Sequence, residues 1–141
     1  MNTKAFVIAD VFTDEQFGGN QLAVYTDARG LEAATMQNIA REMNYSETTF
    51  LLPPEKGGDY RVRIFTPRSE LPFAGHPMVG SAFVIVSEKM KELSEPLTSL
   101  NLETGVGMTQ LRRAGRYISN ALGRQSSSRV ARALDARDPL E

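Results

Sequence analysis

Cysteine is absent from the 141 residues, and histidine occurs once. Without cysteine the chain can form no disulfide, no thiolate metal site and no thiol nucleophile. One histidine and no spaced set of carboxylates predict no metal ligand set. A Ser-His-Asp triad is also disfavoured, because no serine lies in a nucleophile-elbow motif. These absences exclude thiol chemistry and disfavour metal and serine-triad chemistry.

Long apolar runs and a strong charge of one sign are lacking as well. No run reaches the roughly 18 residues of a membrane-spanning helix, and the N-terminus lacks the basic-then-apolar layout of a secretory signal. The formal net charge is −1, which argues against a nucleic-acid-binding protein. We therefore expect a soluble, cytoplasmic protein with enough chain for one hydrophobic core.

Apolar patterning predicts several strands and two helices. The strands are expected over residues 4–12, 22–25, 48–52, 60–65 and 99–104. An i, i+3, i+4, i+7 apolar stripe that begins at Met36 predicts an amphipathic helix over residues 33–44. Pro77 suits the first turn of a second helix, which runs to about Val86 and is apolar on all sides. We therefore expect an α+β fold in which a mostly antiparallel, barrel-like sheet wraps around a central buried helix.

The only histidine stands at the start of this second helix, in the stretch "GHP". The first N–H groups of a helix have no partner within it, and the helix dipole is positive at that end, so the position can hold a carboxylate. Gly75 would let a ligand approach the backbone closely. His76 could donate a hydrogen bond or relay a proton near neutral pH. The alternative is a histidine that only caps its helix, and residue type alone favours that alternative.

Glu47 is a second candidate, in the stretch "NYSETTF" between the amphipathic helix and the next strand. A carboxylate at the entry of a strand can point into a cleft. Partial burial there would raise its pKa toward the range that is useful for moving protons. The alternative is an exposed glutamate in a turn, because most carboxylates in proteins are solvated.

The stretch "FGGNQLAV" is glycine-rich, but it is not expected to bind a nucleotide. It lacks the Gly-Lys-Ser/Thr ending of a phosphate loop, and a strand rather than a helix follows it. Asn20 either fixes the turn or reaches a ligand from it. Glu70 is expected to form a structural ion pair with Arg61, Arg63 or Arg68.

Several of these motifs together resemble a known family. The chain contains, in this order, "FGGNQLAV", "MQNIAREMNYSETTFLL", "YRVRIFTPRSELPFAGHPMVGSAF" and "LNLETGVG". Over about residues 4–109 it resembles the phenazine-biosynthesis PhzF-like proteins, which are relatives of diaminopimelate epimerase. The resemblance implies a fold of two similar halves, each a sheet around a central helix, with the active site in the cleft between them. Only the first half is recognisable in this chain.

The resemblance also implies a chemistry. The best-known member isomerises a dihydro-hydroxyanthranilate by proton transfer, without a cofactor. By this likeness Glu47 is the acid/base and His76 the polariser or proton relay. Asn20 and Gly75 then bind the substrate, a small carboxylated metabolite, and Gln21 stands where the family usually has proline. Epimerase relatives use two cysteines, which this chain lacks, so a carboxylate proton shuttle remains.

Residues 110–141 differ in composition from residues 1–109. The tail has seven arginines, no lysine and three acidic residues, whereas the first part has nine basic and fourteen acidic residues. We expect a PhzF-like N-terminal domain over 1–109 and a divergent tail over 110–141 that resembles no part of the family. A stripe from Leu111 to Ala121 could form a short helix, but a solvated or disordered tail is the stronger expectation. A frame change or truncation would explain this ending.

Three functions stay open at this point. The first is an isomerase that is impaired because its second half is missing. The second is a non-catalytic half-domain that binds a small acid or a partner protein, and the third is an inactive truncated product. A surface that the second half would normally cover could also promote a homodimer.

Overall fold

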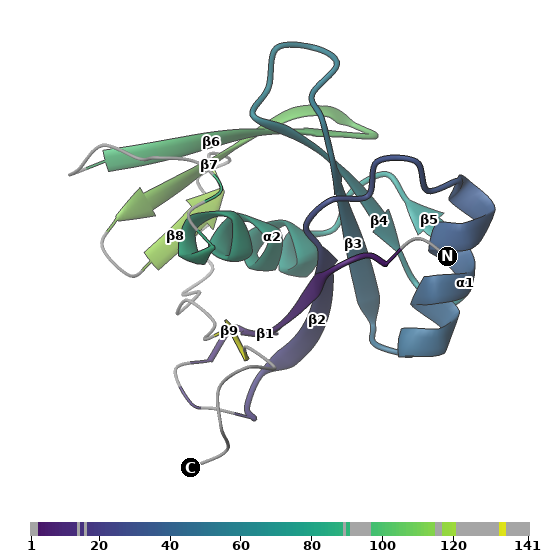
Figure 1. Ribbon diagram of the computed structural model, residues 1–141. Helices are drawn as coiled ribbons and strands as arrows, with labels where there is room; N and C mark the ends of the chain where they lie inside the picture. Colours follow the sequence, from purple (N-terminus) through teal and green to yellow (C-terminus); the bar gives the residue numbers. More distant parts are fainter. Residues whose placement is uncertain are drawn as a thin grey trace.

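The computed structural model describes residues 3–13, 15, 17–88, 90, 97–114, 117–120 and 133–134, which form two helices and nine strands (Figure 1). The elements are β1 (Phe6–Val11), β2 (Asn20–Tyr25), α1 (Ala33–Met43), β3 (Glu47–Leu52), β4 (Tyr60–Phe65), β5 (Glu70–Leu71), α2 (Gly75–Ser87), β6 (Leu97–Thr104), β7 (Gly107–Ala114), β8 (Tyr117–Asn120) and β9 (Ala133–Leu134). Each strand and helix that the sequence predicts is confirmed, with its ends moved by no more than two residues.

The strands form one mixed sheet. Its order is β8-β7-β6-β4-β3-β2-β1-β9, and β5 pairs with β4 beside this path. Two neighbouring pairs are parallel, β2 with β3 and β4 with β6, and the others are antiparallel. The sheet of the described residues is not closed, because the order begins at β8 and ends at β9. The barrel-like wrap therefore stays a prediction.

Helix α2 packs on one face of this sheet, against β1, β2 and β3 (Figure 1). Its close approach depends on Gly80, because a Cβ there would lie 2.5 Å from Cδ2 of Leu22 and 2.8 Å from Cγ2 of Val11. Most of its residues are buried, but Phe83 and Val86 are only half-buried. The prediction that this helix is buried on every side is therefore confirmed only in part. Neither helix of the described residues is long and apolar enough to cross a membrane.

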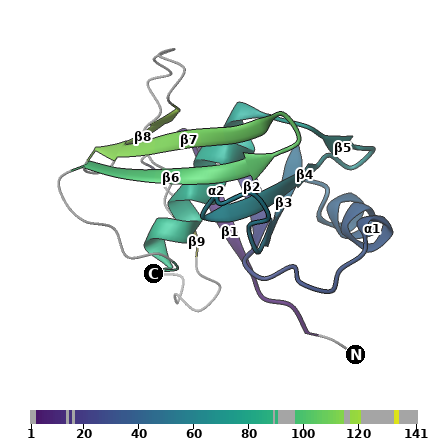
Figure 2. The same cartoon turned by 90° about the horizontal axis from the view of Figure 1, so that it is seen from above.

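Helix α1 lies on the other side of β3 and β4 (Figure 2). Met36 and Ala40 from its apolar stripe are buried in a cluster with Phe50 of β3 and Phe65 of β4. The helix ends at Asn44, which adopts the left-handed conformation (φ 56°) and donates its N–H to the carbonyl of Ala40. This sharp ending turns the chain directly into β3, so that Glu47 becomes the first residue of that strand.

The boundary expected between residues 109 and 110 falls inside β7. This strand pairs with β6 along its whole length, from Gly107 opposite Thr104 to Ala114 opposite Leu97. Leu111 and Ala114, which the sequence suggested for a helical stripe, therefore lie in a strand. Leu111 is buried in the core beside α2, since strand alternation points it inward. Most of residues 110–141, including Ala121, lie outside the described residues.

Candidate active site

Three segments that are distant in sequence meet at one end of the sheet. β2 and β3 run parallel, and Leu22 pairs with Glu47, so Asn20 at the start of β2 lies near the start of β3. Helix α2 begins at Gly75, shortly after β5 pairs with the end of β4. The first residues of β2, β3 and α2 therefore lie at the same end of the fold.

The site is built around a contact between Glu47 and His76. Nδ1 of His76 lies 2.8 Å from Oε2 of Glu47. Nε2 of the same ring lies 3.3 Å from the backbone carbonyl oxygen of Asn20. The side chains of His76 and Glu47 are only 10% and 18% exposed. Three residues that the sequence singled out are thus in direct contact, although Asn20 contributes its carbonyl here.

The donor and acceptor roles of these contacts depend on the tautomer of His76. A carbonyl oxygen can only accept a hydrogen bond, so the bond to Asn20 forms in the states in which Nε2 carries a proton. Nδ1 can then bond to Glu47 in two ways. Either a protonated Glu47 donates to a neutral ring, or an imidazolium donates to the Glu47 carboxylate. In both cases one proton lies between Oε2 and Nδ1, where it can transfer from one group to the other.

The start of α2 is open next to this pair. Ala74 precedes the helix in an extended conformation, and it makes no side-chain capping bond. The first turn contains no acidic residue. Gly75 is exposed, and a Cβ placed on it would meet nothing within 4 Å. The first N–H groups of the helix are therefore accessible to an acceptor such as a carboxylate.

An aromatic residue that the sequence analysis did not single out also borders the site. The ring of Phe12 lies 6.1 Å from the ring of His76, centroid to centroid. Phe12 follows β1 directly and adopts a left-handed conformation (φ 63°), and it is 41% exposed. A phenylalanine is ordinarily expected to continue the strand, so no pattern in the sequence signalled this position.

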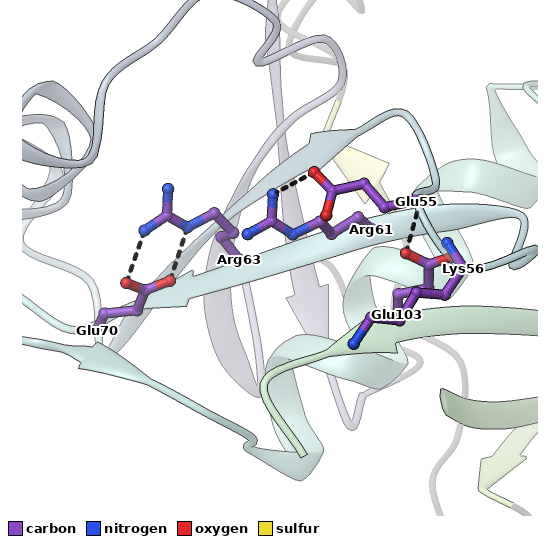
Figure 3. A network of polar contacts seen from close by, with 6 residues as sticks. All are labelled: Glu55, Lys56, Arg61, Arg63, Glu70 and Glu103. Atoms are coloured by element: carbon purple, nitrogen blue, oxygen red, sulfur yellow. Dashed lines mark hydrogen bonds and ion pairs between the residues drawn. The ribbon is translucent and has the colours of Figure 1, made fainter. Parts of the chain in front are cut away.

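A second polar cluster lies on β4 and its neighbours (Figure 3). Arg63 forms a two-pronged ion pair with Glu70, with N–O distances of 2.7 and 2.8 Å. This confirms the structural ion pair expected for Glu70. Arg61 pairs with Glu55 at 3.1 Å. A cavity of about 500 Å³ opens here, away from Glu47 and His76. Because its arginines and carboxylates already have partners, the cavity offers no unpaired arginine or carboxylate to a ligand.

Glu103 organises the loop beside this cavity (Figure 3). Its carboxylate accepts backbone N–H bonds from Glu55 at 2.8 Å, from Lys56 at 2.6 Å and from Gly58 at 3.0 Å. Burial alone raises the pKa of the Glu103 carboxyl. The three hydrogen bonds outweigh that effect, so the pKa of Glu103 lies below its usual range. The role of this residue is structural.

The described residues contain no cluster of three or more histidine, cysteine, aspartate or glutamate side chains that could hold a metal ion. The site therefore consists of a carboxylate, an imidazole, a backbone carbonyl and a helix start.

Comparison with known sequences identifies the family. The chain matches the family model PhzC-PhzF, described as phenazine biosynthesis-like protein, over residues 9–131. It belongs to this family.

The curated relatives of the chain include three proteins named trans-2,3-dihydro-3-hydroxyanthranilate isomerase, all from species of Pseudomonas. The protein from Pseudomonas aeruginosa is 47% identical over 102 residues, which are 72% of this chain and 34% of the relative. The protein from Pseudomonas fluorescens is 42% identical over 134 residues, which are 95% of this chain and 43% of the relative. This match and the family match extend past residue 109, where we expected the resemblance to end. The chain spans less than half the length of these relatives.

Solved structures agree with this assignment. A PhzF-family protein from Bacillus anthracis matches with a TM-score of 0.72 and 33% identity, over 79% of this chain and 36% of that one. A hydroxyproline epimerase from Agrobacterium vitis matches with a TM-score of 0.61 over 79% of this chain and 38% of that one. Its identity of 16% shows a likeness of fold alone.

Proposed function

We propose that this chain carries the acid/base part of an isomerase site that moves a proton between two carbons of a small carboxylated metabolite. The observation that carries this proposal is the contact between Glu47 and His76, with Nε2 of His76 bonded to Asn20. A partly buried carboxylate that exchanges a proton with an imidazole is a suitable general acid and base. The names of the Pseudomonas relatives support an isomerase.

In the proposed reaction Glu47 removes a proton from one carbon and returns it to another. His76 can take that proton through Nδ1 or supply it, so Glu47 reaches the protonation state that each step needs. The carboxylate of the substrate would bind at the first N–H groups of α2, beside Gly75. This binding would hold the reacting carbons within reach of Glu47, because proton transfer needs hydrogen-bond distances. No cofactor takes part in these steps.

We expect the chain alone to be a slow isomerase. Proton transfer between two carbons works best when groups are held on both sides of the substrate, away from water. Glu47 and His76 belong to one sheet-and-helix unit, and Gly75 and Asn20 beside them are exposed. The described part of the chain would therefore position the substrate from one side.

The test is deuterium uptake from heavy water into trans-2,3-dihydro-3-hydroxyanthranilate. We expect slow uptake with the purified chain and a loss of about a hundredfold or more in Glu47→Gln, which keeps the shape but cannot carry the proton. Glu55→Gln is the matched control, because Glu55 forms an exposed ion pair away from the site. Uptake that is equal in Glu47→Gln and the unmodified chain would refute the proposal.

A homodimer is a second candidate for the working form. Phe12 and Phe17, between β1 and β2, are exposed large apolar residues. Val11 at the end of β1 pairs with Asn20, and Leu22 of β2 pairs with Glu47, so these two rings lie at the Glu47 end of the sheet. A second copy that docked on this end would cover apolar surface and supply an opposing wall.

A further inference from the structure

Asp10 is a buried carboxylate that the chemistry described above does not use. It lies in β1 and is 0% exposed. Its Oδ2 accepts the backbone N–H of Phe17 at 2.9 Å. Its Oδ1 has no hydrogen-bond partner in the part of the chain that the structure describes. Burying a carboxylate costs free energy unless it is well hydrogen-bonded. The hydrogen bond from the N–H of Phe17 therefore has to offset that cost.

The segment that Asp10 holds is strained. Phe12 and Phe17 have φ angles of 63° and 67°, in the left-handed region that bulky residues rarely adopt. Gly19 has a φ of 65°, and a Cβ on it would collide with the carbonyl oxygen of Val11. Strained backbone of this kind persists only where the surrounding contacts determine it. The bond from Phe17 to Asp10 is one such contact.

This same segment supplies two of the contacts of the His76 ring. Its end at Asn20 presents the carbonyl that accepts from Nε2 at 3.3 Å. Its beginning at Phe12 places an aromatic ring 6.1 Å from the imidazole. Residues at both ends of the connection between β1 and β2 therefore lie beside the His76 ring.

We propose that Asp10 is a positioning residue for His76. By holding the N–H of Phe17, it keeps the carbonyl of Asn20 directed at Nε2, so that Nδ1 stays available to Glu47. This role rests on the proposed function, in which Glu47 and His76 exchange a proton. The protonation pattern of His76 can nevertheless be measured without any turnover.

The measurement is nitrogen-15 NMR of the imidazole, at a pH where the ring is neutral. The chain has one histidine, so the ring signals report His76 alone. We expect the proton on Nε2, protected from exchange with water by its bond to Asn20. Asp10→Ala should weaken this protection by about tenfold or more, the effect of losing roughly one hydrogen bond. Asp10→Asn should restore it, since an amide oxygen can still accept from Phe17.

Two further variants separate positioning from a general loss of structure. Asp27→Ala is the matched control, because Asp27 also accepts a backbone N–H, from Arg29 at 3.2 Å, in a different turn. It should leave the His76 signals unchanged. Gly19→Ala strains the segment while Asp10 stays in place, and it should reproduce the Asp10→Ala effect. Gly19→Ala therefore tests the proposal even if Asp10→Ala does not fold.

Two results would overturn the proposal: a neutral His76 ring that carries its proton on Nδ1 in the unmodified chain, or unchanged protection of Nε2 in folded Asp10→Ala or Gly19→Ala. An Asp10-dependent His76 signal together with deuterium uptake that does not depend on Glu47 would refute the proposed function alone.

Discussion

Glu47 and His76 lie 2.8 Å apart, although 29 residues separate them in the sequence. The distance results from two local features of the backbone. Asn44 ends α1 abruptly, so that Glu47 opens β3, and the chain after β5 enters α2 at Gly75. The contact has the length of a short hydrogen bond, and both side chains are largely shielded from water. The pair is therefore held in place before any ligand arrives.

The start of α2 can be tested separately from the proton-carrying pair. We expect Gly75→Ala to leave the thermal midpoint nearly unchanged, since an added Cβ meets nothing within 4 Å. The methyl group would nevertheless stand where a bound carboxylate must approach the helix N–H groups. Binding of a small carboxylate, measured by calorimetry or NMR titration, should weaken by about tenfold, roughly the loss of one charge-assisted hydrogen bond. Equal binding by both proteins would place the carboxylate site elsewhere.

A buried hydroxyl pair links α2 to the sheet. The hydroxyls of Thr49 and Ser81 lie 2.8 Å apart, and both residues are fully buried. Ser81→Ala should destabilise the fold by about 1–3 kcal/mol, because the Thr49 hydroxyl loses its partner without gaining water. The double variant Thr49→Val, Ser81→Ala removes both polar groups and should recover much of that loss. Urea unfolding of the three proteins tests this, and a double variant less stable than Ser81→Ala would contradict it.

The sequence predicted the elements whose pattern is local. Residues 60–65 alternate cleanly, and β4 has the expected bounds, with Val62 and Ile64 buried in the core. β7 could not be predicted in this way. Its residues "GMTQLRRA" include few apolar side chains, and the strand is defined by its pairing with β6, a tertiary contact.

The candidate site was predictable in part, for a similar reason. The residue types and the family likeness indicated Glu47, His76, Gly75 and Asn20. The use of the Asn20 carbonyl could not be predicted, because every residue has a carbonyl and its direction depends on the folded turn. The position of the Phe12 ring beside His76 depends on a left-handed backbone conformation, which a phenylalanine in the sequence does not predict.

Glu103 should make the stability of the fold depend on pH. Its pKa in the folded chain lies below the ordinary value of 4.5. The unfolded chain therefore binds the proton first, so the stabilisation is fully present above about pH 4.5 and is lost as the pH falls toward the folded pKa. Glu103→Gln should lower the thermal midpoint near pH 7, and the difference from the unmodified chain should shrink below pH 4.5. A difference that is the same at pH 7 and pH 3 would contradict this.

The apolar end of the sheet predicts self-association that depends on concentration. Phe17 is 66% exposed and Phe12 is 41% exposed, and both follow β1 at the end that carries Glu47. Burying a side chain of this size contributes roughly 1.5–3 kcal/mol, so Phe17→Ser should weaken a dimer by about tenfold or more. Phe6→Ser is the matched control, because Phe6 is also exposed but pairs with Tyr25 at the opposite end of β1. Sedimentation over a range of concentrations measures the association.

If a second copy supplies the opposing wall, deuterium uptake per chain should rise with the dimer fraction and fall in Phe17→Ser. A chain that stays monomeric at every concentration and still shows fast, Glu47-dependent uptake would show that the single unit is a complete site.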